Sequence, residues 1–235
     1  VVRRFYAMAE ARGYRPDNPA IGIKPPKDRT EKAERVKWLP LRAIHAVLEA
    51  PDRGTVKGKR DRAIFALMAL QGLRVSEVVR LQMDDLDLEA REVGELTVLG
   101  KGHKKRTVIL VSESAAAMKE WLEARSRVVV NGEDAVFVSL QRNDGRGTQI
   151  SRYGVRKMVD KHLEDLGLKQ QGISCHALRH SFATLSRAAG ARLDAISRAL
   201  GHASVTTTQV YADIVDAAAE NPARFLVGAL SAATE

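Results

Sequence analysis

The sequence predicts an α+β fold that is mainly helical, with a small antiparallel β-sheet. Three observations support this prediction. Apolar residues recur at helical spacing through most of the chain, one hairpin pattern surrounds a glycine-rich tip, and glycine or proline follows the end of several expected helices. The 235 residues, 45% of them hydrophobic, suffice for one large domain, or for one domain and a fragment of another.

The first 35 residues carry a pattern of their own. Phe5, Met8 and Ala9 have helical spacing, Gly13 suits the end of a helix, and four prolines follow. The chain begins inside this helix without an initiating methionine, so we expect a piece cut from a longer protein. Up to Lys37, ten Lys or Arg stand against five Asp or Glu, which is +5 of the total net charge of +9. This charge suits a linker that follows a phosphate backbone, and equally a solvated linker without contacts.

The net charge of +9 and the isoelectric point near 9.8 concern the chain as a whole. They indicate a polyanionic partner, either nucleic acid or an acidic membrane surface. No apolar run approaches the roughly 18 residues that span a bilayer, and no signal-peptide pattern opens the chain. We therefore expect a soluble protein of the cytoplasm.

Two helices are expected at the start of the second part, which begins at residue 36. Pro40 opens the first helix and Pro51 ends it. The second covers Arg60–Gln71, with Gly72 directly after its end. Arg74 therefore emerges at a junction between helices.

A basic hairpin is expected next. Residues 92–99 and 106–111 flank the sequence GKGHKK, which predicts two strands around a glycine-rich tip. Lys101, Lys104, Lys105 and Arg106 bring four positive charges with no acid among them. Such a tip can contact DNA phosphates, but it is also a common way to protect a solvated sheet edge.

Further elements are expected between residues 112 and 167. Ser112 caps a helix to about Arg125, and Ala135–Ser139 has the pattern of a short strand. A glycine-rich loop follows at 143–148. Ser151 then caps a helix that Gly167 ends.

The stretch from Ser174 to Tyr211 gathers polar side chains. A helix from Ser174 to about Ala189 places His176, Arg179, His180 and Ala183 on one face, with an apolar stripe of Leu178, Phe182 and Leu185 roughly opposite. A second helix, Leu193–Leu200, ends at Gly201 and leaves His202 in the turn. Three successive threonines, 206–208, have poor helix propensity, so we expect Tyr211 to lie on a weakly helical, movable segment.

These motifs closely resemble those of the tyrosine recombinases, the phage-integrase family. HALRH, then LGHAS, then a tyrosine match the C-terminal motif of the family. GLRVSEVVRL at 72–81 resembles its first-arginine motif, and LGKGHKKRTVIL at 99–110 its lysine-bearing hairpin. The resemblance covers most of the chain. It implies that residues 1–35 are the end of an N-terminal core-binding domain with a basic linker, and that 36–235 are the catalytic domain.

The resemblance also implies the catalytic residues Arg74, Lys101, His176, Arg179, His202 and Tyr211. Their chemistry can be argued from the side chains. At pH 7 only about one tyrosine hydroxyl in a thousand is ionised, and a phosphodiester repels the attacking oxygen. Two arginines can neutralise the non-bridging oxygens, His202 can donate a further hydrogen bond, His176 can take the phenolic proton, and Lys101 can protonate the leaving oxygen. We expect neither a metal nor another cofactor.

Several side chains keep two interpretations. Lys104, Lys105 and Arg106 are candidate DNA contacts. Glu77 either binds the amides at a helix start or holds Arg74. His180, four residues after His176, could complete a zinc pair but suits a supporting hydrogen bond better, because Arg179 lies between the two and the glutamate of an HExxH motif is missing. Cys175 is either a small buried residue or a reactive thiol.

The resemblance implies a site-specific recombinase or integrase that forms a 3′-phosphotyrosyl intermediate and acts as a homotetramer on double-stranded DNA sites. Two other functions stay open: a type IB topoisomerase, and a DNA-binding regulator whose catalytic site has decayed. Apolar residues near the C-terminus (Phe225, Leu226, Val227 and Leu230) predict a final helix, which packs either on its own domain or on a neighbouring subunit.

Overall fold

The computed structural model describes residues 2–23, 36–90, 93–100, 104–141, 145–202 and 207–219. The chain divides into two compact units, Val1–Glu31 and Lys32–Glu235. In the described ranges, no helix combines the length and the apolar character needed to cross a membrane.

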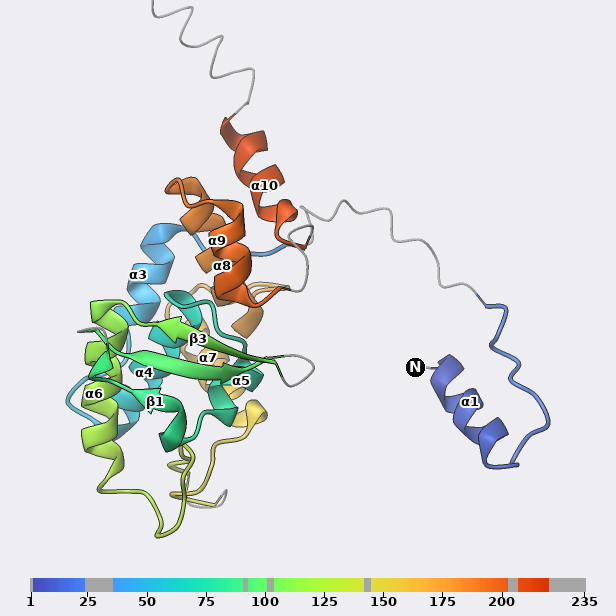
Figure 1. Ribbon diagram of the computed structural model, residues 1–235, viewed down its shortest axis with the longest axis horizontal. Coiled ribbons are helices and arrows are strands. Elements are labelled where there is room, and N and C mark those ends of the chain that lie inside the picture. The colour runs from blue at the N-terminus through green and yellow to red at the C-terminus, as the bar shows by residue number, and fades with distance from the viewer. Residues whose placement is uncertain are drawn as a thin grey trace, which may run out of the picture. The chain divides into compact units, whose positions relative to one another are not determined.

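The first unit contains helix α1, Val2–Ala11 (Figure 1). The segment after the helix folds back on it, because Arg3 Nε donates to the Ala20 carbonyl at 2.9 Å and Asn18 donates to the Arg3 carbonyl at 3.2 Å. Ala20 is consequently buried although the unit is small.

The second unit contains a three-stranded antiparallel sheet in the order β1-β2-β3. The strands are β1 Leu86–Asp87, β2 Glu95–Leu99 and β3 Lys105–Ile109. β2 and β3 form the predicted hairpin, in register from Glu95 opposite Ile109 to Leu99 opposite Lys105. The hairpin tip, with Lys101, lies outside the described residues.

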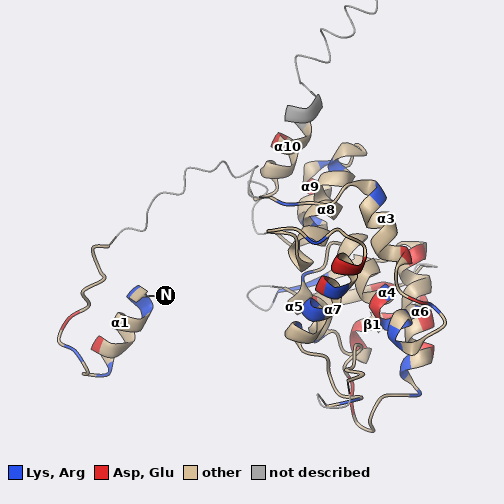
Figure 2. Cartoon of the chain, turned by 180° about the vertical axis from the view of Figure 1, so that it is seen from behind, with Lys and Arg blue, Asp and Glu red and all other residues tan. Residues whose placement is uncertain are grey.

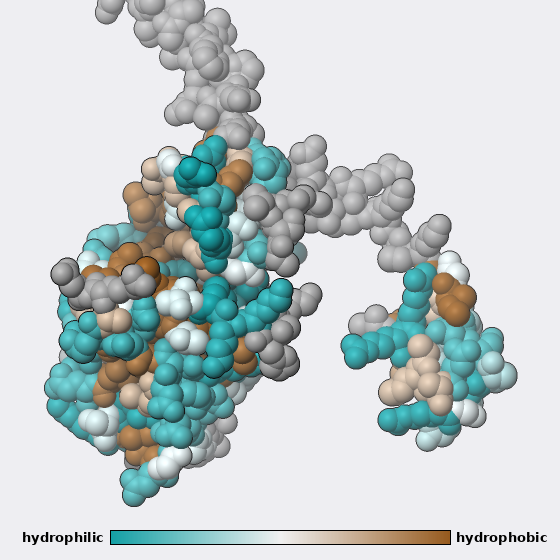
Figure 3. Space-filling model, viewed as in Figure 1, coloured by the Kyte–Doolittle hydropathy of each residue, from teal (hydrophilic) through white to brown (hydrophobic). Residues whose placement is uncertain are grey.

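Helices make up about half of the described part of the second unit and far outweigh the strands, so the predicted class, a mainly helical α+β fold with a small antiparallel sheet, is confirmed. The helices are α3 Leu41–Glu49, α4 Val56–Ala69, α5 Val75–Arg80, α6 Ser112–Arg125, α7 Arg152–Asp165, α8 Cys175–Ala188, α9 Leu193–Leu200 and α10 Gln209–Ala219, with a 3₁₀ turn at Met83–Asp85. Charges of both signs line α4, α6 and α7 on the face shown in Figure 2. The opposite face is largely hydrophilic, with hydrophobic residues visible between the polar ones (Figure 3).

The core is built around α4, which packs against α3, α6 and α8. The side chains of Ile64, Phe65 and Leu67 are fully buried. On α6, Trp121 stacks on Phe137 and donates its indole N–H to the Val136 carbonyl at 2.9 Å. A helix buried on most of its sides gives the surrounding elements a rigid support.

The segment Ala135–Ser139 corrects one prediction, because it is buried but belongs to no strand of the sheet. It forms two isolated bridges, Gln82 with Ala135 and Val138 with Gln149. Its carbonyl groups are shared between side chains and backbone: Arg60 Nη1 donates to Val138 at 3.2 Å and Trp121 to Val136, whereas the amides at 147 and 150 donate to the carbonyls at 139 and 137.

The segment of Tyr211 corrects another prediction. Helix α10 includes this residue, although three threonines precede it. Tyr211 is 3% exposed and packs in a small apolar cluster with Ala183, Ile196 and Leu200. The threonines lie before the first residue of the helix, Gln209, so their poor helix propensity does not bear on α10 itself.

Candidate active site

Arg74 enters the site from the start of α5. Gly72, in the left-handed region at φ +67°, turns the chain between α4 and α5, and an added Cβ would lie 2.5 Å from the Phe182 ring. Arg74 is the N-cap residue of α5 and about a third of its side chain is exposed. Its Nη1 donates a hydrogen bond to Glu77 Oε1 at 2.8 Å and a longer one to the Leu200 carbonyl at 3.4 Å. The turn therefore fixes where this guanidinium lies.

Glu77 is the buried anion that holds the arginines. It accepts hydrogen bonds from the backbone N–H and from Nη1 of Arg74, both at 2.8 Å, and from Nη1 and Nη2 of Arg106 at 3.0 and 3.1 Å. Arg179 Nη1 lies 3.8 Å from it. Burial opposes ionisation, but hydrogen bonds from Arg106 and Arg74 outweigh it and hold the Glu77 pKa below its ordinary value. Glu77 thus serves both of its proposed roles, as it binds the helix-start amide and also holds Arg74.

Arg179 projects from α8 and is only 5% exposed. Its guanidinium donates to the Gly72 carbonyl and, at 2.7 Å, to the Leu200 carbonyl. Burial, together with the nearby charge of Arg74, lowers its pKa to about 10, so it stays protonated at neutral pH. Two backbone carbonyls therefore fix a buried positive charge beside Arg74.

His180 and Tyr211 contact each other directly. His180 Nδ1 lies 2.8 Å from the Tyr211 hydroxyl. Burial, and then the charges of His176 and Arg179, lower the His180 pKa to about 4, so its imidazole is neutral at pH 7. Burial raises the Tyr211 pKa against the opposing effect of Arg179 and Arg74. The hydroxyl is thus protonated beside a neutral imidazole that can take its proton.

His202 follows the end of α9. The helix ends at Gly201, as predicted, and this glycine adopts the left-handed conformation at φ +61° and turns the chain into His202. His202 Nδ1 lies 2.9 Å from the hydroxyl of the buried Thr208. Burial and the charges of Arg179 and Arg74 lower its pKa to about 4. Thr208 is a supporting residue that sequence reasoning considered only for its poor helix propensity.

His176 is exposed on the first turn of α8. Partial desolvation and the charges of Arg156, Arg179 and Arg74 lower its pKa. The neighbouring Cys175 is 1% exposed, and burial raises the pKa of its thiol to about 11, which favours the interpretation as a small packed residue.

A cleft of about 700 Å³ brings five of the six predicted catalytic residues together with His180. Lys101, the sixth, lies outside the described residues. Lys104 and Lys105 are exposed on the hairpin, whereas Arg106 turns inward. The residues lining this cleft include Arg74, His176, Arg179, His180, His202 and Tyr211.

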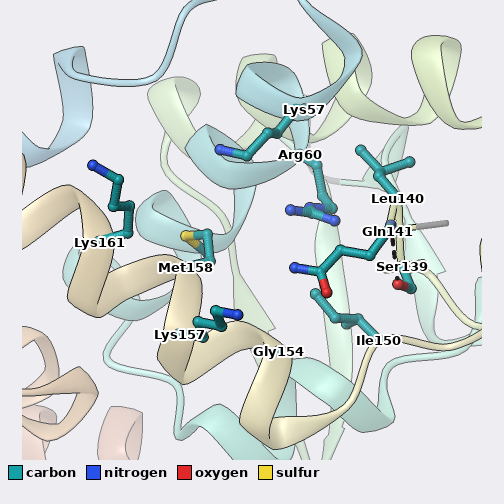
Figure 4. A pocket seen from close by; sticks show the side chains of 10 residues that line it. All are labelled: Lys57, Arg60, Ser139, Leu140, Gln141, Ile150, Gly154, Lys157, Met158 and Lys161. Atoms are coloured by element: carbon teal, nitrogen blue, oxygen red, sulfur yellow. Dashed lines mark hydrogen bonds between the residues drawn. The ribbon is translucent and has the colours of Figure 1, made fainter. Parts of the chain in front are cut away.

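A second, smaller cavity of about 190 Å³ lies between α4 and α7 (Figure 4). Lys57, Arg60, Lys157 and Lys161 line it. The buried Asp61 neutralises part of this charge, since it accepts from Lys57 at 2.9 Å and from Arg60 at 2.7 Å. None of the predicted catalytic residues lines this cavity.

Comparison with known proteins assigns the class. The Phage integrase family matches residues 37–217. Tyrosine recombinase XerD of Neisseria meningitidis is 36% identical over 217 residues, which are 91% of this chain and 70% of the relative. XerC of Pelobacter propionicus is 37% identical over 214 residues, 91% of this chain and 66% of the relative. The chain therefore belongs to the phage integrase family.

Solved structures support the same fold. XerA recombinase superposes with a TM-score of 0.63 at 28% identity, over 74% of this chain and 59% of that chain. XerH bound to a palindromic difH substrate, a post-cleavage complex, gives a TM-score of 0.71 at 24% identity, over 86% of this chain and 57% of that one. The present chain thus spans little more than half the length of these solved recombinases.

Proposed function

We propose that this chain carries the catalytic site of a site-specific DNA recombinase or integrase. One observation carries the proposal: the Tyr211 hydroxyl lies against a neutral imidazole in a cleft shared with Arg74 and Arg179. A tyrosine nucleophile, an acceptor for its proton and two charges for a phosphate are the parts that phosphoryl transfer to tyrosine requires.

In the first step, the Tyr211 oxygen bonds to the phosphorus of a DNA phosphodiester, and the bond from phosphorus to the 5′ oxygen breaks. The phenolic proton passes to His180, the imidazole in contact with it, rather than to the exposed His176. Arg74 and Arg179 neutralise the non-bridging oxygens, to which His202 donates a further hydrogen bond. Lys101 gives the leaving oxygen its proton.

In the second step, a 5′ hydroxyl from the partner duplex attacks the 3′-phosphotyrosine and releases Tyr211. The phosphotyrosine bond conserves the energy of the broken phosphodiester, so no nucleotide cofactor is needed. The guanidinium groups supply the positive charge, and the reaction is therefore metal-independent.

The assembly we propose is a homotetramer on two DNA sites in the cytoplasm. Its support is the family membership, together with the basic charge of the chain. Residues 220–235, which lie outside the described residues, would provide the helix exchanged between subunits. Residues 1–35 would close a core-binding domain and lead the chain along the DNA.

The nucleophile is tested with a nicked suicide substrate that traps the covalent complex. Tyr211→Phe removes only the attacking oxygen, so we expect DNA binding to persist and the adduct to vanish. Sequencing the trapped DNA ends identifies the site. An adduct of undiminished yield in Tyr211→Phe would show that another residue attacks. Exchange of ends between two duplexes, rather than relaxation of supercoils alone, separates a recombinase from a type IB topoisomerase.

A further inference from the structure

Arg106 lies on β3 but turns away from the basic hairpin tip. Its side chain is 16% exposed, whereas Lys104 and Lys105 beside it are exposed. Strand alternation explains the difference from Lys105, because residues two apart share a face and Val108 belongs to the core, whereas Lys104 lies before the strand. Arg106 therefore projects into the domain.

The guanidinium of Arg106 joins two segments that carry predicted catalytic residues. It forms a fork with both carboxylate oxygens of Glu77, which in turn holds the backbone and side chain of Arg74. Its Nε donates to the Ala199 carbonyl at 3.2 Å, in the last turn of α9. Strand β3, helix α5 and the end of helix α9 thus meet at the side chain of Arg106.

Gly201 shows how closely these groups pack. An added Cβ at this position would lie 3.0 Å from Arg106 Nη1 and 3.1 Å from Cζ. The left-handed glycine that turns the chain into His202 therefore rests on the Arg106 guanidinium. A shift of Arg106 would move the segment before His202 as well as Glu77.

We propose that Arg106 is a positioning residue of the reaction, which sets the places of Arg74 and His202 without contacting DNA itself. This inference rests on the proposed strand-transfer function. The contacts favour this role over a phosphate contact. Both Nη atoms of Arg106 already bind the buried Glu77 carboxylate, and its Nε binds a carbonyl at the end of α9.

The test compares Arg106→Ala and Arg106→Lys with Lys105→Ala. Cleavage is followed at saturating protein, on a suicide substrate with an ordinary scissile phosphate and on one with a neutral methylphosphonate. Arg74 acts on the charge of a non-bridging oxygen, which the methylphosphonate lacks, so a displaced Arg74 matters less there. DNA affinity is measured in parallel over a range of salt concentrations.

We expect Arg106→Ala to cleave ordinary DNA about 10²-fold more slowly, the cost of a misplaced group, and to lose less than about tenfold on the methylphosphonate. Arg106→Lys should recover little, because an ammonium cannot bind both Glu77 oxygens in a fork. The salt slope of binding should stay unchanged. Lys105→Ala should instead weaken binding and reduce that slope by about one unit.

Two results would overturn the inference: equal losses of Arg106→Ala on both substrates, or a reduced salt slope with an unchanged cleavage rate at saturation. If the unmutated chain forms no adduct on any DNA, the proposed function fails by itself. Hydrogen exchange of backbone amides then tests the positioning role of Arg106 without any reaction. The amides of Arg74 and His202, bonded to Glu77 and to the Ser197 carbonyl, should exchange faster in Arg106→Ala, and unchanged exchange at both refutes the positioning role.

Discussion

Removing His180 should slow cleavage in a manner that depends on pH. In the structure its Nδ1 lies 2.8 Å from the Tyr211 hydroxyl, and its pKa of about 4 leaves the imidazole neutral from pH 5 upward. Cleavage by the unmutated protein should therefore change little between pH 6 and 9. In His180→Ala, only molecules with an already ionised Tyr211 can attack.

The size of the effect follows from the ionised fraction. An ordinary tyrosine is about one part in a thousand ionised at pH 7, and burial raises the Tyr211 pKa. General-base catalysis contributes about 10²- to 10⁴-fold. We expect His180→Ala to be slower by about 10³-fold at pH 7, and the deficit should shrink about tenfold for each unit of rising pH.

The assay is single-turnover adduct formation on a nicked suicide substrate at saturating protein, from pH 6 to 9. His176→Ala is the matched control on the same helix. If His180 takes the proton, the His176→Ala deficit should not vary with pH. A constant deficit in His180→Ala, with a shrinking one in His176→Ala, would assign the proton to His176 and refute the reasoning.

Three further outcomes are expected. Lys101→Ala should be severely slowed on ordinary DNA but cleave a 5′-bridging phosphorothiolate at close to the unmutated rate, since a thiolate leaves without an acid; equal slowing on both would make Lys101 a binding residue. The logarithm of DNA affinity should fall linearly with the logarithm of salt concentration, and a flat titration would argue against phosphate contacts. Asp61→Asn should lower the free energy of unfolding in urea by about 3–5 kcal/mol, because it leaves the buried Arg60 without its carboxylate. The control Asp165→Asn, which breaks an exposed pair, should cost at most about 1 kcal/mol.

The contribution of Asp61 to the free energy of unfolding should also depend on pH. Burial opposes its ionisation, but hydrogen bonds from His162, Arg60 and Lys57 outweigh burial and hold its pKa below the ordinary 3.8. A carboxyl group with a lowered folded-state pKa stabilises the fold above its unfolded pKa. This contribution is lost as the pH falls through the lower, folded value. The difference in unfolding free energy between the unmutated protein and Asp61→Asn should therefore be constant near neutrality and shrink below about pH 4.

The features that the sequence predicts correctly are those set by residues close together in the chain. Gly201 ends α9, and β2 pairs with β3 around the glycine-rich tip, both as expected. The shared face of His176, Arg179 and His180 followed from helical periodicity in the same way. Such features depend on a few neighbouring residues, which the sequence shows directly.

Features that depend on distant partners were missed. The two-residue strand β1 exists because Leu86 pairs with Leu96. In the segment 135–139, the carbonyls of Val136 and Val138 accept from side chains of α6 and α4. Arg106 was grouped with the lysines of the tip, although its spacing from Val108 placed it on the inner face. Counting charges shows only that the hairpin is basic. Strand alternation shows which of its side chains point into the domain.

The arginines and the histidines of the cleft divide the chemistry between them. The guanidinium groups of Arg74 and Arg179 stay protonated at neutral pH, even where burial lowers the Arg179 pKa to about 10. Burial, with the charges of His176 and Arg179, lowers the His180 pKa to about 4, and burial, with those of Arg179 and Arg74, lowers the His202 pKa to about 4. Arg179 therefore provides a fixed positive charge for a phosphate and also adds to the effect of burial in keeping both imidazoles neutral. In this cleft, burial and Arg179 thus leave His180 uncharged, with a ring nitrogen that can accept the proton of the tyrosine at the moment of attack.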